Sequence, residues 1–126
     1  MARFQHLEVY HDLYRFVREL YKLKQKLPQA LKHDLGQAAC TSALRALKGI
    51  TVANGSITKG RTLNTVLLEI ESLWVQLRLM YDLKGITKGE FEVMSALLSK
   101  VQPQIQNWIK WEKRKPSPPT ENANTQ

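Results

Sequence analysis

The sequence predicts an all-α protein whose fold class is an antiparallel up-down-up-down four-helix bundle. Three observations lead to this prediction. Apolar residues recur at three- and four-residue spacing in four long segments, which is the period of an amphipathic helix. Glycine or proline stands in each of the three connections, which are short enough for neighbouring helices to run antiparallel. No segment shows the strict two-residue alternation that favours a sheet.

Length and charge set the domain organisation and the class of partner. The 126 residues suit one domain with its own core. We assign 1–115 to the bundle, and 116–126, rich in Pro, Ser, Thr and Asn, to a disordered tail. The formal net charge of +8 favours nucleic acid, an anionic membrane surface or an acidic protein as partner. No signal-peptide run or membrane-spanning run is present, so a cytoplasmic protein without a membrane partner is expected.

The first helix is expected from Leu7 to Leu27 and is ended by Pro28. Its predicted core stripe consists of Tyr10, Leu13, Tyr14, Val17, Leu20, Tyr21 and Leu27. The opposite side carries a basic row made of Arg15, Arg18, Lys22 and Lys26. Glu8, Asp12 and Glu19 lie beside this row at ion-pair spacing. We interpret the row first as a solvated, self-paired face and second as a contact for an anionic partner.

The second helix is expected from about Leu31 to Asn54, where Asn54-Gly55 is a stop signal. Many of its residues are small and would let neighbouring helices approach closely: Gly36, Ala38, Ala39, Ala43, Ala46, Gly49 and Ala53. The lone Cys40 among them is interpreted as a buried thiol. The stretch from Leu35 to Leu68 has no Asp or Glu, so its cations are the first candidates for anion contacts: Arg45, Lys48, Lys59 and Arg61.

The third helix is expected from about Thr62 to Lys84, with Thr62 as N-cap. Beyond its core stripe it carries a second apolar row on the far side, made of Leu68, Val75, Leu79 and Leu83. Leaving such a row in water is disfavoured by roughly 1.5–3 kcal/mol per large residue. We therefore predict an oligomer or partner interface there, with ordinary surface scatter as the alternative. Arg78 is either a nucleic-acid contact or the ion-pair partner of Glu71 or Asp82.

The fourth helix begins after Gly85 with the capping box Thr87-Lys88-Gly89-Glu90. Pro103 lies inside this helix and predicts a kink. The chain becomes basic from Lys110, the last candidate contact, and the neighbouring Trp111 is the one tryptophan expected to be exposed for base stacking. Motifs for metal binding, phosphate loops or nucleophilic catalysis are absent from the sequence. We therefore expect a non-enzymatic protein without a metal or another cofactor.

Four segments, taken in order, resemble a known family: Leu27-Pro28, Leu35-Gly36-Gln37, Leu77-Arg78-Leu79 running into Tyr81-Asp82-Leu83-Lys84-Gly85-Ile86-Thr87, and Ile105-Gln106-Asn107-Trp108-Ile109-Lys110. The set is similar to Avd, the accessory variability determinant of diversity-generating retroelements, over about Leu7 to Lys110. A sister group, the four-helix-bundle proteins of 23S ribosomal RNA intervening sequences, shares the start. That group usually has Asn-Ile-Ala-Glu-Gly where this chain has Thr51-Val52-Ala53-Asn54-Gly55.

The resemblance implies a ring-shaped homopentamer that binds a reverse transcriptase and its template RNA. Such proteins support the adenine-mutagenising cDNA synthesis that diversifies a target gene. The chain departs from the family pattern at three places: Gln106-Asn107 replace a glycine pair, Ala38-Ala39 replace basic residues, and Pro103 replaces a helix-compatible residue. The alternative function is a structural four-helix-bundle protein of the intervening-sequence type without nucleic-acid binding. A peripheral membrane protein fits less well, because mixed charges oppose the apolar stripes.

Overall fold

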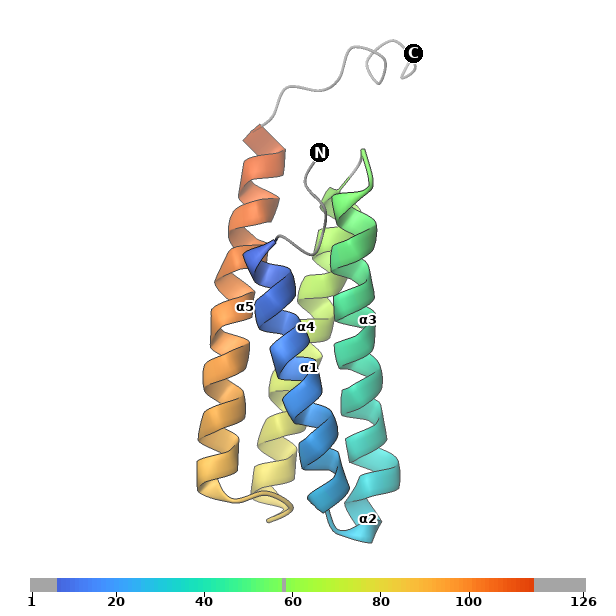
Figure 1. The fold of residues 1–126 in the computed structure, drawn as a ribbon, viewed down its shortest axis with the longest axis vertical. Helices are drawn as coiled ribbons and strands as arrows, with labels where there is room; N and C mark the ends of the chain where they lie inside the picture. Colours follow the sequence, from blue (N-terminus) through green and yellow to red (C-terminus); the bar gives the residue numbers. More distant parts are fainter. Residues whose placement is uncertain (1–6, 58, 115–126) are drawn as a thin grey trace.

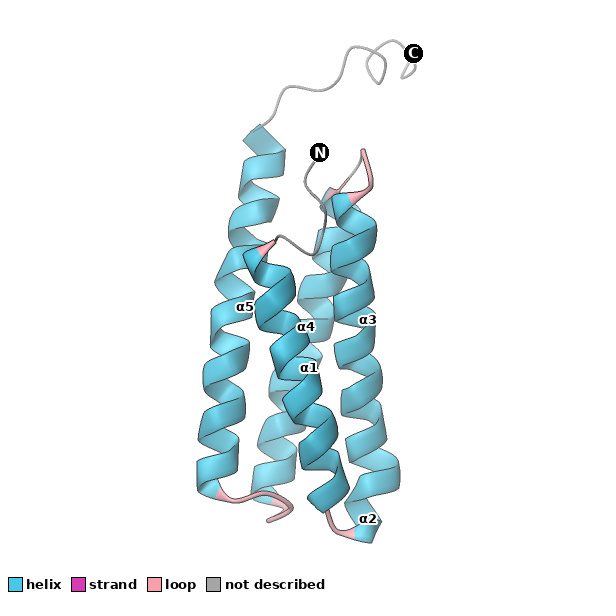
Figure 2. Ribbon diagram, viewed as in Figure 1, coloured by secondary structure: helices cyan, strands magenta, loops and turns pink. Residues whose placement is uncertain are grey.

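A computed structural model describes residues 7–57 and 59–114 of the chain. Its long helices are α1 (Glu8–Lys26), α3 (Gln37–Asn54), α4 (Gly60–Asp82) and α5 (Lys88–Arg114). The short α2 (Gln29–Leu31) and a π-helical turn, η2 (Lys32–Gly36), lead into α3. The described residues contain no strand, which confirms the all-α prediction (Figure 2). The predicted disordered tail, 116–126, lies outside the described residues.

The four long helices lie side by side as a bundle (Figure 1). Helix α1 packs against α3 and α5, and α4 packs against the same two helices, so helices consecutive in the chain are neighbours. The core between them is apolar and fully buried, and its largest side chains include Leu13, Phe16, Leu20, Ile50, Leu73 and Leu98. The connection between α3 and α4 lies at the end of the bundle where α5 finishes (Figure 1).

The core face of α1 is rotated from the predicted stripe. Leu13, Val17, Leu20 and Leu27 are buried as expected, and so are Val9, Phe16 and Leu23, which were not part of the prediction. Tyr14 and Tyr21 are 47% and 38% exposed, so their assignment to the core was wrong. The physical reason is that the buried face centres on Leu13, Phe16 and Leu20, which leaves the tyrosines at its edge.

Two glycines permit close helix packing around α3. A Cβ at Gly49 would lie 2.4 Å from Cγ2 of Val66 in α4. A Cβ at Gly36 would lie 2.8 Å from Cδ1 of Leu27 and 3.1 Å from Cγ of Lys24. The small residues of this helix therefore do allow close approach, as the sequence predicts.

The helix ends differ in detail from the predictions. Helix α4 begins at Gly60, with Lys59 as its N-cap residue, so the prediction of Thr62 as N-cap was wrong. Gly55 has φ −94° and ψ 3°, not the left-handed conformation expected after Asn54. The capping box of α5 is confirmed: the Thr87 N–H donates to Glu90 Oε1 at 2.9 Å and the Glu90 N–H donates to Thr87 Oγ1 at 3.0 Å. Helix α5 continues through Pro103 without a break.

The end of α4 is closed by a left-handed turn at Lys84 rather than at Gly85. Lys84 has φ 63°, and the Gly85 N–H donates to the Met80 carbonyl at 2.8 Å while the Lys84 N–H donates to that of Tyr81 at 2.9 Å. This is the Schellman pattern, in which glycine is usual at the left-handed position. Gly85 is instead needed because a side chain does not fit there. A Cβ added at this position would lie 2.6 Å from Cδ1 of Leu31.

We expect Lys84→Gly to stabilise the protein. An L-residue in the left-handed region is strained by roughly 1–2 kcal/mol, and part of this is offset by the larger unfolded-state entropy of glycine. A gain of about 0.5–1 kcal/mol should appear in the unfolding free energy from urea denaturation. Gly85→Ala, one residue away, is the matched control and should destabilise. A neutral or destabilising Lys84→Gly would show that the turn carries no such strain.

Candidate nucleic-acid interface

The acid-free stretch contributes exposed cations that have no carboxylate partner in the part of the chain that the structure describes. Arg45 and Lys48 are exposed on neighbouring turns of α3, and Arg61 is exposed in the first turn of α4. The ion pairs within 4.0 Å among the described residues involve none of these three. Lys59 differs, because it is only partly exposed and its ammonium donates a hydrogen bond to the Ser56 carbonyl. Three of the four first-ranked candidates are therefore available to an external anion.

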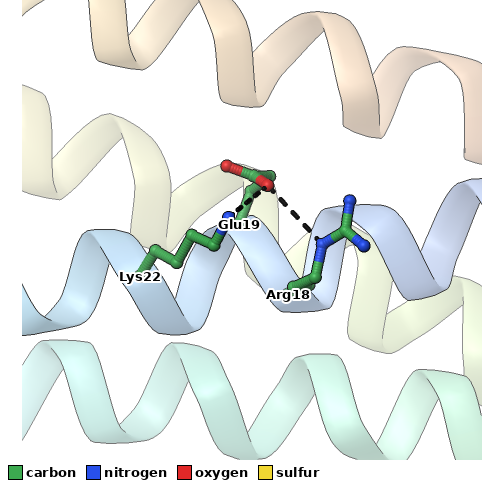
Figure 3. A network of polar contacts seen from close by, with 3 residues as sticks. All are labelled: Arg18, Glu19 and Lys22. Carbon is green, nitrogen blue, oxygen red and sulfur yellow. Dashed lines mark hydrogen bonds and ion pairs between the residues drawn. The ribbon is translucent and has the colours of Figure 1, made fainter.

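The basic row of α1 is largely shared with carboxylates. Figure 3 shows Arg18 and Lys22 approaching the same Glu19 carboxylate, with Arg18 Nε at 3.7 Å and Lys22 Nζ at 3.4 Å from Oε2. Lys26 Nζ lies 4.0 Å from Glu90 Oε2 on α5. Arg15 is exposed and has no such pair among the described residues. Because exposed pairs contribute only about 0–1 kcal/mol each, the row is weakened as an anion site rather than closed.

The last two candidates occupy opposite ends of the bundle. Arg78 Nε donates to both carboxylate oxygens of Asp82, at 3.0 and 3.2 Å, so the predicted ion pair with Asp82 is present. Lys110 is exposed near the end of α5, and Lys113 and Arg114 follow it there. Arg61 also lies at that end, beside the α3–α4 connection (Figure 1). Arg61 and Lys110 therefore lie toward one end of the bundle, while Arg45 and Lys48 lie along α3.

The apolar row of α4 is on the surface. Leu68, Val75, Leu79 and Leu83 are between 43% and 67% exposed. A hollow of about 430 Å³ lies beside the row and is lined by Trp74, Val75, Arg78, Leu79 and Asp82. The assignment of this row to an oligomer interface stays a prediction, and its exposure is what that prediction requires.

Sequence reasoning missed a groove between α1 and α5. Its volume is about 720 Å³, and its lining includes Leu23, Lys22 and Lys26 from α1 with Gly89, Val93 and Met94 from α5. Val93 is 58% exposed. One indication of this groove was present in the sequence, namely Gly89, which has no side chain to fill it.

Among the described residues, burial raises the pKa of two side chains. Cys40 is buried, and burial raises the pKa of its thiol above the ordinary value of 9.0, with Lys24 opposing the shift. The pKa of Tyr21 is also raised, first by burial and then by Cys40. The shift at Cys40 favours the thiol over the thiolate, which is the form that acts as a nucleophile. Among the described residues, no group of three His, Cys, Asp or Glu side chains could hold a metal ion.

Comparison with known proteins does not place the chain in a family. No protein-family model matches the sequence, and no curated protein matches it. The resemblance to Avd proteins therefore stays an expectation from the sequence. Within 7–57 and 59–114, no helix is long and apolar enough to cross a bilayer.

Proposed function

We propose that this protein is a basic, non-enzymatic accessory protein of a diversity-generating retroelement. It binds the reverse transcriptase and the template RNA or cDNA in the cytoplasm and supports mutagenic cDNA synthesis. The observation that carries the proposal is the set of exposed cations, Arg45, Lys48 and Arg61, which have no carboxylate partner among the described residues. Such cations neutralise phosphates and release counterions, with little reading of base sequence.

The proposed assembly is a ring-shaped homo-oligomer of up-down-up-down protomers. Exposure of the apolar row of α4 to water is unfavourable, and this supports self-association. The number of five subunits comes from the resemblance to Avd proteins. A ring needs a heterologous contact in which two different surfaces of the same chain meet. The row of α4 would supply one of those two surfaces.

The proposal is tested by reconstituting cDNA synthesis. We expect a reverse-transcriptase gene and a template/variable repeat pair beside the gene for this protein. The purified transcriptase and template RNA should make cDNA with substitutions opposite adenines only when this protein is added. Sequencing of the cDNA measures both yield and substitution frequency. Equal yield and equal substitution frequency without the protein would contradict the accessory role.

The intervening-sequence type of structural protein is the second candidate. It is favoured by the ion pairs of Arg18, Lys22, Lys26 and Arg78, which account for four of the ten predicted contacts. Under this alternative, the charge is solubilising and largely self-paired. It predicts that removing the unpaired cations has no consequence for any nucleic-acid activity, which separates it from the accessory role.

A further inference from the structure

Two exposed tyrosines, Tyr14 and Tyr21, lie on one side of α1, next to the partly buried Tyr10. Tyr14 and Tyr21 are both substantially exposed, and they are seven residues apart, which places them two turns apart on the same side of the helix. The rings of Tyr10 and Tyr14 are stacked, with centroids 6.1 Å apart and an interplanar angle of 26°. A row of aromatic faces therefore lies at the surface, where the sequence pattern predicted a core stripe.

This row borders α3. Lys24 Nζ donates to Gln37 Oε1 at 2.9 Å, and Tyr21 lies close enough to Cys40 for the two side chains to interact electrostatically. Lys24 is thus level with Gln37, and Tyr21 is level with Cys40. Each residue back along α1 therefore corresponds to one residue forward along α3. At the same one-for-one correspondence, Tyr14, seven residues before Tyr21, comes level with Leu47, seven residues after Cys40. The exposed Leu44 lies one turn before Leu47 on α3, so it adds an apolar surface to the seam.

Among the described residues, no carboxylate lies along the seam between α1 and α3. Helix α3 contains no Asp or Glu. The acids of α1 lie on its other side, because Asp12 accepts a hydrogen bond from Gln104 of α5 at 2.7 Å and Glu19 lines the groove shared with α5. Glu8, one turn before Asp12, falls on that same side. The nearest acid in sequence to α3 is Asp34, in η2 at the end of the seam.

Cations border the aromatic row on both helices. Arg18 follows Tyr14 by four residues, which puts it about 40° around α1 and away from the core. Lys48 follows Leu44 by four residues and stands in the same relation on α3. Both are exposed, and Arg18 keeps only a long contact of 3.7 Å to Glu19. The surface thus has aromatic faces in the middle and positive charge at both margins.

We propose that the seam between α1 and α3 is a stacking platform for single-stranded nucleic acid, with bases on Tyr14 and Tyr21 and phosphates at Arg18 and Lys48. The two tyrosines are about 10 Å apart along α1, which matches about three base spacings of 3.4 Å. Stacking on aromatic rings requires an unpaired base with a free face, and a duplex hides these faces except at its ends. The platform therefore selects single strands, and it rests on the proposed nucleic-acid function.

The test compares Tyr14→Ala/Tyr21→Ala with Tyr14→Phe/Tyr21→Phe. Neither residue belongs to the buried core, and the phenylalanines keep the aromatic faces while losing the hydroxyls. The probes are a fluorescent oligo-dT 20-mer and a blunt duplex of the same length, with affinity measured by anisotropy at one salt concentration. We expect the alanine variant to bind the single strand about tenfold or more weakly and the duplex unchanged. The phenylalanine variant should bind both probes as the wild type does.

The outcomes separate this inference from the proposed function. Wild-type affinity of the alanine variant for the single strand, or equal weakening for strand and duplex, would overturn the stacking platform. Salt-dependent binding that depends on Arg45 and Arg61 would then still support the proposed function. A wild-type protein that binds neither probe would overturn both. Light scattering that shows a dissociated alanine variant with unchanged single-strand affinity would assign the seam to a second copy of the chain and overturn the platform.

Discussion

Val75→Asp/Leu79→Asp is expected to convert the assembly into monomers. In the proposed assembly this part of α4 is buried against a neighbouring subunit, so two carboxylates would be moved from water into an apolar contact whose neighbouring cation, Arg78, is already paired with Asp82. Burial of an unpaired charge costs several kcal/mol even after the surroundings relax, so two buried aspartates should strongly weaken the association of the subunits. Light scattering should therefore report the mass of one chain, 14.5 kDa, in place of a multiple of it.

Val93→Asp is the matched control for this experiment. Val93 is 58% exposed and Val75 is 67% exposed, so both changes place an aspartate on the surface of the isolated protomer, but on different helices. The control should keep the mass of the wild-type assembly, and helix content by circular dichroism should be the same in all variants. A wild-type protein with the mass of one chain would remove the interface assignment. An oligomer that survives Val75→Asp/Leu79→Asp would place the contact elsewhere on the surface.

Removing the three unpaired cations of the acid-free stretch, with Arg45→Ala, Lys48→Ala and Arg61→Ala together, should weaken nucleic-acid binding by on the order of a hundredfold at 0.15 M salt. Each phosphate contact multiplies affinity by roughly four- to sixfold at that salt concentration through counterion release. Lys59 is left intact, because its ammonium is engaged with the Ser56 carbonyl at the start of α4. Fluorescence anisotropy with a labelled single-stranded RNA measures the loss.

The matched control removes the same charge from paired positions. Lys22→Ala, Lys26→Ala and Arg78→Ala also lower the net charge by three, but these cations already share carboxylates. We expect this control to weaken binding by less than about fivefold, since each loss also frees an acidic group. Equal losses in both triple variants would show that only the net charge matters. No loss in the Arg45, Lys48 and Arg61 variant would favour the structural protein of the intervening-sequence type.

The helical architecture could be predicted from local patterns in the sequence. The 3.6-residue period identified four helices. Thr87 and Glu90 specified the start of α5, because they form the two reciprocal hydrogen bonds of a capping box within four residues. The period fixes the width of an apolar stripe but not its centre. Which edge is covered depends on the neighbouring helices, and this is why Tyr14 and Tyr21 were misassigned to the core.

In the candidate site, too, contacts within one helix could be predicted from the sequence and contacts between helices could not. The pairs of Lys22 with Glu19 and of Arg78 with Asp82 are local and could be predicted from their spacing. The contact of Lys26 with Glu90 joins two helices, and the hydrogen bond from Gln104 to Asp12 does the same. Such contacts depend on how far one helix is shifted along the other, which no pattern within a single helix encodes. The segregation of the α1 acids toward α5 therefore appeared only in the structure.

The salt dependence of binding tests the central claim most directly. We measure the affinity of the wild type and of the Arg45, Lys48 and Arg61 triple variant for a single-stranded RNA between about 50 and 200 mM salt. The logarithm of the wild-type association constant should fall linearly with the logarithm of the salt concentration, and the slope of the variant should be shallower by roughly 2 to 3. Wild-type binding that does not change with salt, or two identical slopes, would contradict an electrostatic nucleic-acid interface on the acid-free stretch.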